Sequence, residues 1–287
     1  MTPVIDAHHH FLDPGRFRYP WLGPGLEALD RRFGPEDLGP ELVRAGVDAT
    51  VLVQTIPSVE ETRTFLRIAE QTTWVSGVVG WADLTDPNLA AVIEDLRAQP
   101  GGSHLVGFRH QVHDEADPAW LRRSDVDRGL GIIAAEGLSY DLLVRTRELP
   151  FALDPVRHHR DLRFVIDHLA KPPIASGDLG AWKRALRPFA DQPNVWAKLS
   201  GLVTEADWLR WRTADLAEAV DTAVELFGAD RLLFGSDWPV CRLAASYGQV
   251  IDAAGELTAT RSAAERSAIF GGAATRAYPG LAVSDGV

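Results

Sequence analysis

The residues best suited to metal chemistry stand near the N-terminus, in the segment Asp6-Ala7-His8-His9-His10. Alternate side chains of an extended segment share one face, so His8 and His10 point together while His9 points away. Two imidazoles about 7 Å apart along a strand can converge on one divalent ion, with Asp6 on the same side to support them. Taken alone, the motif is also compatible with three histidines in a polar loop.

Two later segments also carry side chains that can bind a metal ion. Asp237 closely follows an apolar run that ends at Phe234, and a carboxylate buried there is costly unless it is paired or bound to metal. A helix N-cap is the simpler role for its Ser-Asp pair. His168 comes after another apolar run, Phe164-Val165-Ile166. The combination of a His-x-His pair, a His and an Asp indicates a metal site more specifically than any one of these groups alone.

Eight short β-branched or aromatic runs recur along the chain, and helix-like stretches separate them. The runs are Val4–Ala7, Thr50–Gln54, Val75–Gly80, Leu105–Arg109, Ser139–Val144, Arg163–Asp167, Val195–Leu199 and Arg231–Phe234. Alternating strands and helices imply a parallel sheet, and eight units favour a single closed (β/α)8 TIM barrel, one domain over residues 1–287. The chemistry of such a barrel lies at the carboxyl ends of its strands, where the segments above stand.

One stretch, Phe11 to Pro40, interrupts this regularity with five Pro, five Gly and several aromatic residues. A long aromatic loop that leaves the first strand at the active face is either a lid over the pocket or packing that plugs the barrel mouth. The sequence does not decide between these two roles.

Composition excludes several classes of protein. The net charge of −11 argues against a surface for nucleic acid or anionic membranes. Cys241 is the only cysteine, so a metal site must use His and carboxylate ligands. No apolar run reaches the roughly 18 residues of a membrane helix, and the N-terminus does not resemble a signal peptide. We expect a cytoplasmic protein that acts on a small molecule without nucleic acid or a membrane; a homo-oligomer is left open.

Further polar side chains at strand ends are candidates for binding a substrate. The chain has three lysines, and two of them, Lys171 and Lys198, fall at predicted strand ends, whereas His113 lacks such a placement. With Arg109 they slightly favour an anionic or strongly polar substrate, because a guanidinium fork suits a carboxylate. The full set of candidates is Arg109, His110, Lys171, Lys198, Trp81 and Gln54.

Together these motifs resemble the amidohydrolase superfamily. More narrowly, the chain is similar to the amidohydrolase-2 branch, which holds sugar-lactone hydrolases of the L-fuconolactonase and L-rhamnonolactonase type. The resemblance extends from about Val4 to about Arg276. It rests on Asp6-Ala7-His8-His9-His10, Tyr19-Pro20-Trp21-Leu22, Gly107-Phe108-Arg109-His110, Tyr140-Asp141-Leu142-Leu143-Val144, Asp167-His168-Leu169-Ala170-Lys171-Pro172, Lys198-Leu199-Ser200-Gly201-Leu202 and Gly235-Ser236-Asp237-Trp238-Pro239.

The resemblance implies a (β/α)8 fold and a mononuclear site in which His8, His10, His168 and Asp237 hold one divalent metal, zinc before others. Binuclear members use a bridging carboxylate and a His at the fifth strand, where Asp141 stands here. Some relatives of this branch work without metal, so a metal-free centre is the alternative.

Hydrolysis of a lactone ring, of the sugar or muconolactone type, is the activity that the resemblance implies, with Asp237 and His168 as catalytic residues. Zinc would lower the pKa of water to about 7, and Asp237 would take the proton of the water and return it to the ring oxygen. Without metal, the histidines with Arg109 or Lys198 would donate to the carbonyl oxygen. The alternatives are a metal-dependent decarboxylase of an aromatic or unsaturated acid on the same barrel, and a barrel without catalysis.

Overall fold

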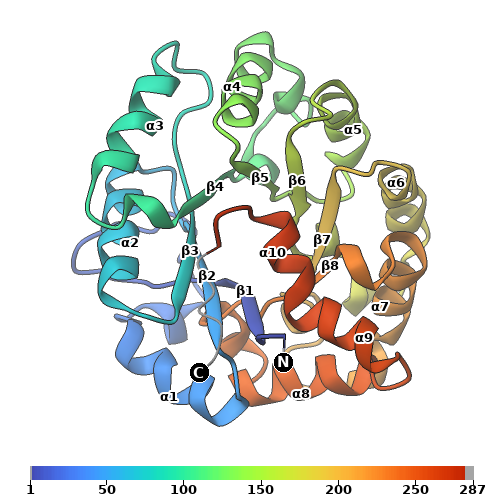
Figure 1. Ribbon diagram of the computed structural model, residues 1–287. Helices are drawn as coiled ribbons and strands as arrows, with labels where there is room; N and C mark the ends of the chain where they lie inside the picture. The colour runs from blue at the N-terminus through green and yellow to red at the C-terminus, as the bar shows by residue number, and fades with distance from the viewer. Residues whose placement is uncertain (1, 282–287) are drawn as a thin grey trace.

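The computed structural model describes residues 2–281 of the 287-residue chain, and its centre is an eight-stranded sheet. Neighbouring strands are parallel throughout and follow one another in sequence order. The strands are β1 (Ile5–His9), β2 (Ala49–Val53), β3 (Val75–Gly80), β4 (Leu105–His110), β5 (Ser139–Leu142), β6 (Arg163–Ile166), β7 (Val195–Leu199) and β8 (Leu232–Phe234). The predicted single (β/α)8 barrel is confirmed, and the strands lie within a few residues of the predicted runs (Figure 1).

Helices surround this sheet and bury their apolar faces against it (Figure 1). The helices are α1 (Pro35–Ala45), α2 (Val59–Gln71), α3 (Leu89–Ala98), α4 (Ser124–Ala135), α5 (Leu149–His158), α6 (Gly180–Ala190), α7 (Thr213–Phe227), α8 (Tyr247–Leu257), α9 (Ala263–Ser267) and α10 (Ala273–Ala277). In α7, Leu216, Val220, Ala223 and Phe227 are buried along one stripe, as their helical spacing requires.

Backbone contacts between β1 and the segment after β8 bring the first and last strands together. The amide of His10 donates to the carbonyl of Trp238 at 2.6 Å, and the amide of Asp237 donates to that of His8 at 2.8 Å. The chemically important ends of the two strands are therefore held side by side by the main chain itself.

The carboxylate of Asp6 is buried beside the loop that carries Asp237. It accepts hydrogen bonds from the Ser236 amide at 2.8 Å, from the His8 amide at 3.2 Å and from the Tyr247 hydroxyl of α8 at 3.2 Å. Asp6 therefore holds the backbone of His8, one of the predicted histidine pair, and the backbone of the loop after β8.

The C-terminal helix α10 lies across one end of the barrel, at the centre of the view in Figure 1. Its alanines and Tyr278 pack with interior residues such as Ile5 and Val51. Ala277 accepts a hydrogen bond from the Ser139 hydroxyl at the start of β5, so the covered end is the amino end of the strands. The carboxyl end is left for chemistry.

The irregular stretch after β1, predicted to extend from Phe11 to Pro40, is shorter in the structure. It ends at Gly34, and α1 begins at Pro35. Leu12 pairs with Phe33 in an antiparallel bridge, and both side chains are buried. Trp21 donates its indole N–H to the carbonyl of Thr55 at 3.1 Å. These contacts pack the stretch against the barrel at its mouth.

A left-handed segment follows β6. His168, Leu169, Ala170 and Lys171 have φ of 51°, 51°, 60° and 53°, a conformation that costs non-glycine residues roughly 1–2 kcal/mol each. The buried Trp182 of α6 donates its indole N–H to the carbonyl of Leu169 at 2.6 Å. This bond helps to hold the strained turn that places His168.

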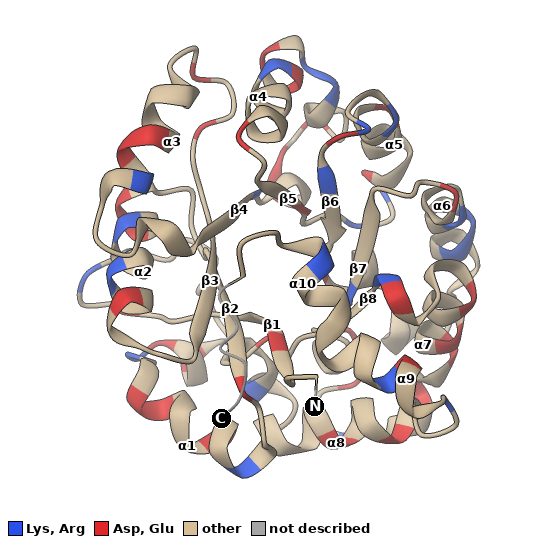
Figure 2. Cartoon of the chain, in the orientation of Figure 1, with Lys and Arg blue, Asp and Glu red and all other residues tan. Residues whose placement is uncertain are grey.

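Charged side chains of both signs are mixed over the outer helices, as Figure 2 shows. Within residues 2–281, no helix is long and apolar enough to cross a membrane.

We expect Trp182→Phe to destabilise the protein by about 1–3 kcal/mol, because the Leu169 carbonyl loses its buried donor. Trp196→Phe is the matched control, since the Trp196 indole nitrogen has no hydrogen-bond partner among the described residues. Urea unfolding followed by tryptophan fluorescence measures both variants. Equal losses of unfolding free energy would show that the indole hydrogen bond contributes little.

Candidate active site

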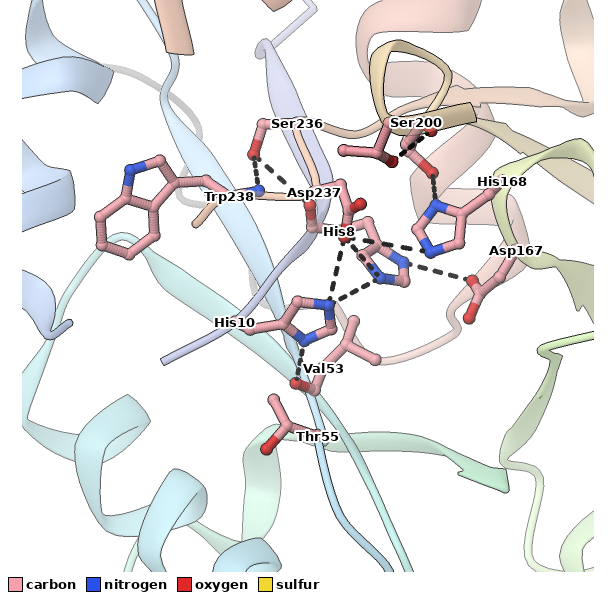
Figure 3. A network of polar contacts seen from close by, with 12 residues as sticks. His8, His10, Val53, Thr55, Asp167, His168, Ser200, Ser236, Asp237 and Trp238 are labelled. Atoms are coloured by element: carbon pink, nitrogen blue, oxygen red, sulfur yellow. Dashed lines mark hydrogen bonds and ion pairs between the residues drawn. The ribbon is translucent and has the colours of Figure 1, made fainter. Parts of the chain in front are cut away.

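The four residues predicted to form the centre come together at the carboxyl end of the barrel (Figure 3). Asp237 Oδ1 lies 3.3 Å from His10 Nε2, 3.8 Å from His8 Nε2 and 3.9 Å from His168 Nε2. The Nε2 atoms of His8 and His10 are 3.2 Å apart. Three imidazole nitrogens therefore face one carboxylate oxygen.

Each imidazole ring is also held from its other nitrogen. His10 Nδ1 lies 2.7 Å from the carbonyl oxygen of Val53, and His168 Nδ1 lies 2.9 Å from the hydroxyl of Ser200. His8 Nδ1 lies between Asp167 Oδ1, at 3.2 Å, and the Lys198 ammonium, at 3.0 Å. For His10 and His168, a proton on Nδ1 leaves the lone pair of Nε2 free for a metal ion, which is the usual arrangement around ligating histidines.

This donor set fits a divalent metal ion. Zinc–nitrogen bonds of about 2.0–2.1 Å place tetrahedral ligands roughly 3.4 Å apart. The distances of 3.3–3.9 Å from Asp237 Oδ1 to the three imidazole nitrogens, and of 3.2 Å between the Nε2 atoms of His8 and His10, lie close to that value. Three nitrogens with one carboxylate oxygen are ligands that zinc accepts.

Protonation also suits a metal centre. Burial lowers the pKa of His168 to about 4, and burial together with the charge of Lys198 lowers the pKa of His8 well below its usual value, so both rings are neutral near pH 7. Burial alone would raise the pKa of Asp237, but His168 and His10 hold it below the ordinary value. The carboxylate is therefore ionised and able to accept a proton.

A cavity of about 370 Å³ opens above these residues. Its floor includes His10, His168 and Asp237. Around them lie the polar residues Thr55, Arg109, Gln111, His113, Asp114, Arg145, Lys171, Thr204 and Glu205, and the apolar residues Trp21, Leu26, Leu143, Trp208, Val240 and Leu243. Such a mixed lining suits a small polar molecule with an apolar part.

Two of the predicted substrate-binding residues, Arg109 and Lys171, line this cavity. The structure places the other four outside the lining, where their polar groups contact other protein groups. Gln54 donates to the Arg109 carbonyl at 3.0 Å. Trp81 donates to His110 at 3.0 Å, and His110 Nε2 contacts Glu115 at 2.8 Å. Lys198 is fully buried between carboxylates.

Sequence reasoning missed several residues of the site. Ser200, which orients His168, follows β7 within a segment used only for the resemblance. His113 and Arg145 line the cavity from the loops after β4 and β5. Arg145 directly follows the predicted run Ser139–Val144, so placement after strands could have indicated Arg145 as well as Ser200. His113 lacks such a position, and only the folded loop after β4 brings it to the mouth.

Comparison with known proteins agrees with this geometry. Residues 5–280 match the Amidohydrolase family, in its amidohydrolase-2 form. The chain belongs to the amidohydrolase family. It is 42% identical to the L-fucono-1,5-lactonase of Burkholderia multivorans, over 96% of this chain and 95% of that protein. An L-rhamnono-gamma-lactonase of Scheffersomyces stipitis is 26% identical over half of this chain and 48% of its own length.

Solved structures place this amidohydrolase in the same group. A crystal structure of an amidohydrolase from Burkholderia multivorans with bound zinc has a TM-score of 0.90 and 41% identity, covering 96% of this chain and 99% of that one. A 2,6-dihydroxybenzoate decarboxylase has a TM-score of 0.67 at 15% identity, over 96% and 99% of the two chains. The latter likeness shows the shared barrel alone.

We expect Gly201→Ala to disrupt the centre of this amidohydrolase. A Cβ atom there would lie 2.5 Å from His168 Nδ1 and 3.1 Å from Asp237 Oδ2. Gly137 is the matched control, because its φ of +70° resembles the +63° of Gly201 while nothing lies within 4 Å of its Cβ position. Both alanines should cost about 1–2 kcal/mol of stability, but only Gly201→Ala should reduce kcat/KM, by at least about tenfold. Equal activity of the two variants would contradict the assigned geometry.

Proposed function

We propose that this protein is a lactonase that opens a sugar-lactone ring by attack of water, with Asp237 as the general base. The single observation that carries the mechanism is the ionised carboxylate of Asp237, which faces three imidazoles on the floor of a cavity. The substrate class is supported by two L-fucono-1,5-lactonases, 42% and 43% identical over most of this chain.

The reaction needs one proton to move twice. Asp237 takes a proton from water as the oxygen of that water attacks the lactone carbonyl carbon. When the ring C–O bond breaks, Asp237 returns the proton to the leaving alkoxide, and a hydroxy acid is formed. Such general base and general acid steps contribute roughly 10²- to 10⁴-fold each. His168, fixed by Ser200, keeps the carboxylate oriented from the cavity floor.

One divalent ion, with zinc as the preferred metal, would be held by His8, His10, His168 and Asp237. It would supply Lewis-acid polarisation of the carbonyl and a lower pKa for the attacking water. The zinc-bound Burkholderia multivorans structure supports this assignment.

Charge on the carbonyl oxygen builds up as water attacks. Arg109 and Lys171, which line the cavity, are the cations placed to stabilise it. Both already have an acidic partner: Arg109 Nη1 lies 3.0 Å from Asp167 Oδ2, and Lys171 Nζ lies 2.8 Å from Glu205 Oε1. A third cation of the lining, Arg145, has no ion pair among the described residues, so these charges alone do not separate a neutral lactone from an anionic one. The two L-fucono-1,5-lactonases support the neutral polyhydroxylated lactone.

Decarboxylation on the same barrel is the alternative. Its support is distant, because dihydroxybenzoate decarboxylases are only 15–16% identical and show the fold alone.

A cytoplasmic location and action on a small molecule without nucleic acid stay predictions from the sequence. The sequence left open whether the protein forms a homo-oligomer.

A panel of substrates tests the proposed reaction. We expect L-fucono-1,5-lactone and related neutral aldonolactones to be hydrolysed, and 2-pyrone-4,6-dicarboxylic acid to be used at least about tenfold less efficiently. Proton release in a pH-indicator assay and carbon dioxide release are measured in parallel. Carbon dioxide from 2,6-dihydroxybenzoate, with no acid from any lactone, would establish the decarboxylase instead.

We expect Asp237→Asn to lower kcat by about 10²- to 10⁴-fold, because an amide cannot accept the proton. Asp95→Asn is the control, since this carboxylate pairs with Arg63 at 2.8 Å on the outer helices, away from the cavity, and should keep activity within a few-fold. Circular dichroism and melting temperature verify that both variants fold. Turnover of Asp237→Asn within a few-fold of the unaltered enzyme would exclude Asp237 as the base.

A further inference from the structure

A second group of metal-ligand type lies on the other side of His8. The His8 ring, Asp141 and Asp167 are all buried, and one ligand atom from each lies within 4.8 Å of the others. His8 Nε2 faces His10 and Asp237, whereas His8 Nδ1 faces Asp167. The single ring of His8 therefore separates two potential metal positions.

The ammonium group of Lys198 stands within this second group. Lys198 Nζ lies 2.5 Å from Asp141 Oδ2, 2.9 Å from Asp167 Oδ1 and 3.0 Å from His8 Nδ1. The lysine side chain is fully buried on β7, so water does not solvate its charge. A lysine ammonium is a compact point charge, comparable in that respect to a metal ion.

Charges in this layer are balanced without any added ion. Asp141 and Asp167 carry two negative charges, and Lys198 and Arg109 supply two positive ones. The Tyr278 hydroxyl also donates to Asp141 at 2.8 Å. A divalent ion added here would meet a buried ammonium at close range in a medium of low dielectric, and that repulsion opposes its binding.

We propose that Lys198 is a built-in second cation, whose ammonium takes the position that a second divalent ion would hold between His8, Asp141 and Asp167. The centre therefore accepts one metal per chain at the His8–His10–His168–Asp237 position. By pairing with Asp167, Lys198 also acts as a positioning residue for His8. This proposal deepens the proposed function but concerns metal binding alone, so it is tested without any substrate.

Metal content tests the proposal directly. Protein stripped with a chelator is titrated with Mn²⁺, desalted and analysed for metal by mass spectrometry, while electron paramagnetic resonance detects magnetic coupling between neighbouring ions. We expect the unaltered protein to show uncoupled Mn²⁺ at the centre, and Lys198→Ala to bind one further ion with a coupled spectrum. Coupling matters because Asp127, His158 and His159 form a separate group of ligand type that can add only an uncoupled ion.

Lys183→Ala is the matched control, because this lysine pairs with Glu218 at the surface and should leave the metal content unchanged. A second control, Lys198→Met with Asp141→Asn, removes the ammonium and one carboxylate together. This double variant should keep the buried charges nearly balanced and should bind no pair of magnetically coupled Mn²⁺ ions. A coupled pair in the unaltered protein, or its absence in folded Lys198→Ala, would overturn the proposal.

Removal of Lys198 leaves Asp141 buried without a cation and Asp167 paired with Arg109 alone, so the variant is expected to fold poorly without metal. Recovery of its native circular dichroism and melting transition on addition of Mn²⁺ or Zn²⁺ would support the proposal, because the metal then replaces the ammonium. A variant that stays unfolded at saturating metal would contradict it. Both results are independent of lactone hydrolysis. If the substrate assay detected no hydrolysis, the number of metal ions bound per chain would still test this proposal.

Discussion

Three buried imidazoles can face one carboxylate only because each ring is held at its other nitrogen. Without Val53, Asp167 and Ser200, the rings could rotate and the burial of so many polar atoms would be uncompensated. The partners are of three kinds: a strand carbonyl, a carboxylate and a hydroxyl. Val53 and Ser200 come from the strands or strand ends next to those of His10 and His168, whereas Asp167 reaches His8 from the end of β6, which is not a neighbour of β1. The barrel as a whole therefore keeps the centre in place.

Backbone strain at the site is compensated by packing around it. His168 and Asp237 both have positive φ, and Gly201 lies between their side chains where no larger residue fits. Strained backbone of this kind persists where surrounding structure determines it, and it concentrates at functional sites. Here Trp182 holds the turn after β6 and Asp6 holds the loop after β8. The residues that stabilise these loops are thus also residues that position the chemistry.

Below the histidines, a layer of paired charges separates the site from the apolar interior that α10 closes. Burial raises the pKa of Asp141 to about 6, still below neutral pH. Burial also opposes ionisation of Asp167, but Lys198 and His8 hold its pKa well below the usual value. Both carboxylates are therefore charged near pH 7. Their charge orients His8 from below.

The amino-acid sequence by itself determined the fold class and the identity of the central four residues. Strand and helix periodicities are local, and the end of a buried strand is visible in the sequence, so His8, His10, His168 and Asp237 could be predicted from their neighbours. Only the tertiary structure decided which polar groups remain free for a substrate. Lys198 and Gln54 stand at strand ends as Arg109 does, yet partners far away in the chain occupy them. Asp6 accepts from the amides of His8 and Ser236, and the loop after β4 brings His113 into the cavity lining. Such outcomes depend on pairwise contacts between distant segments, and no local pattern contains them.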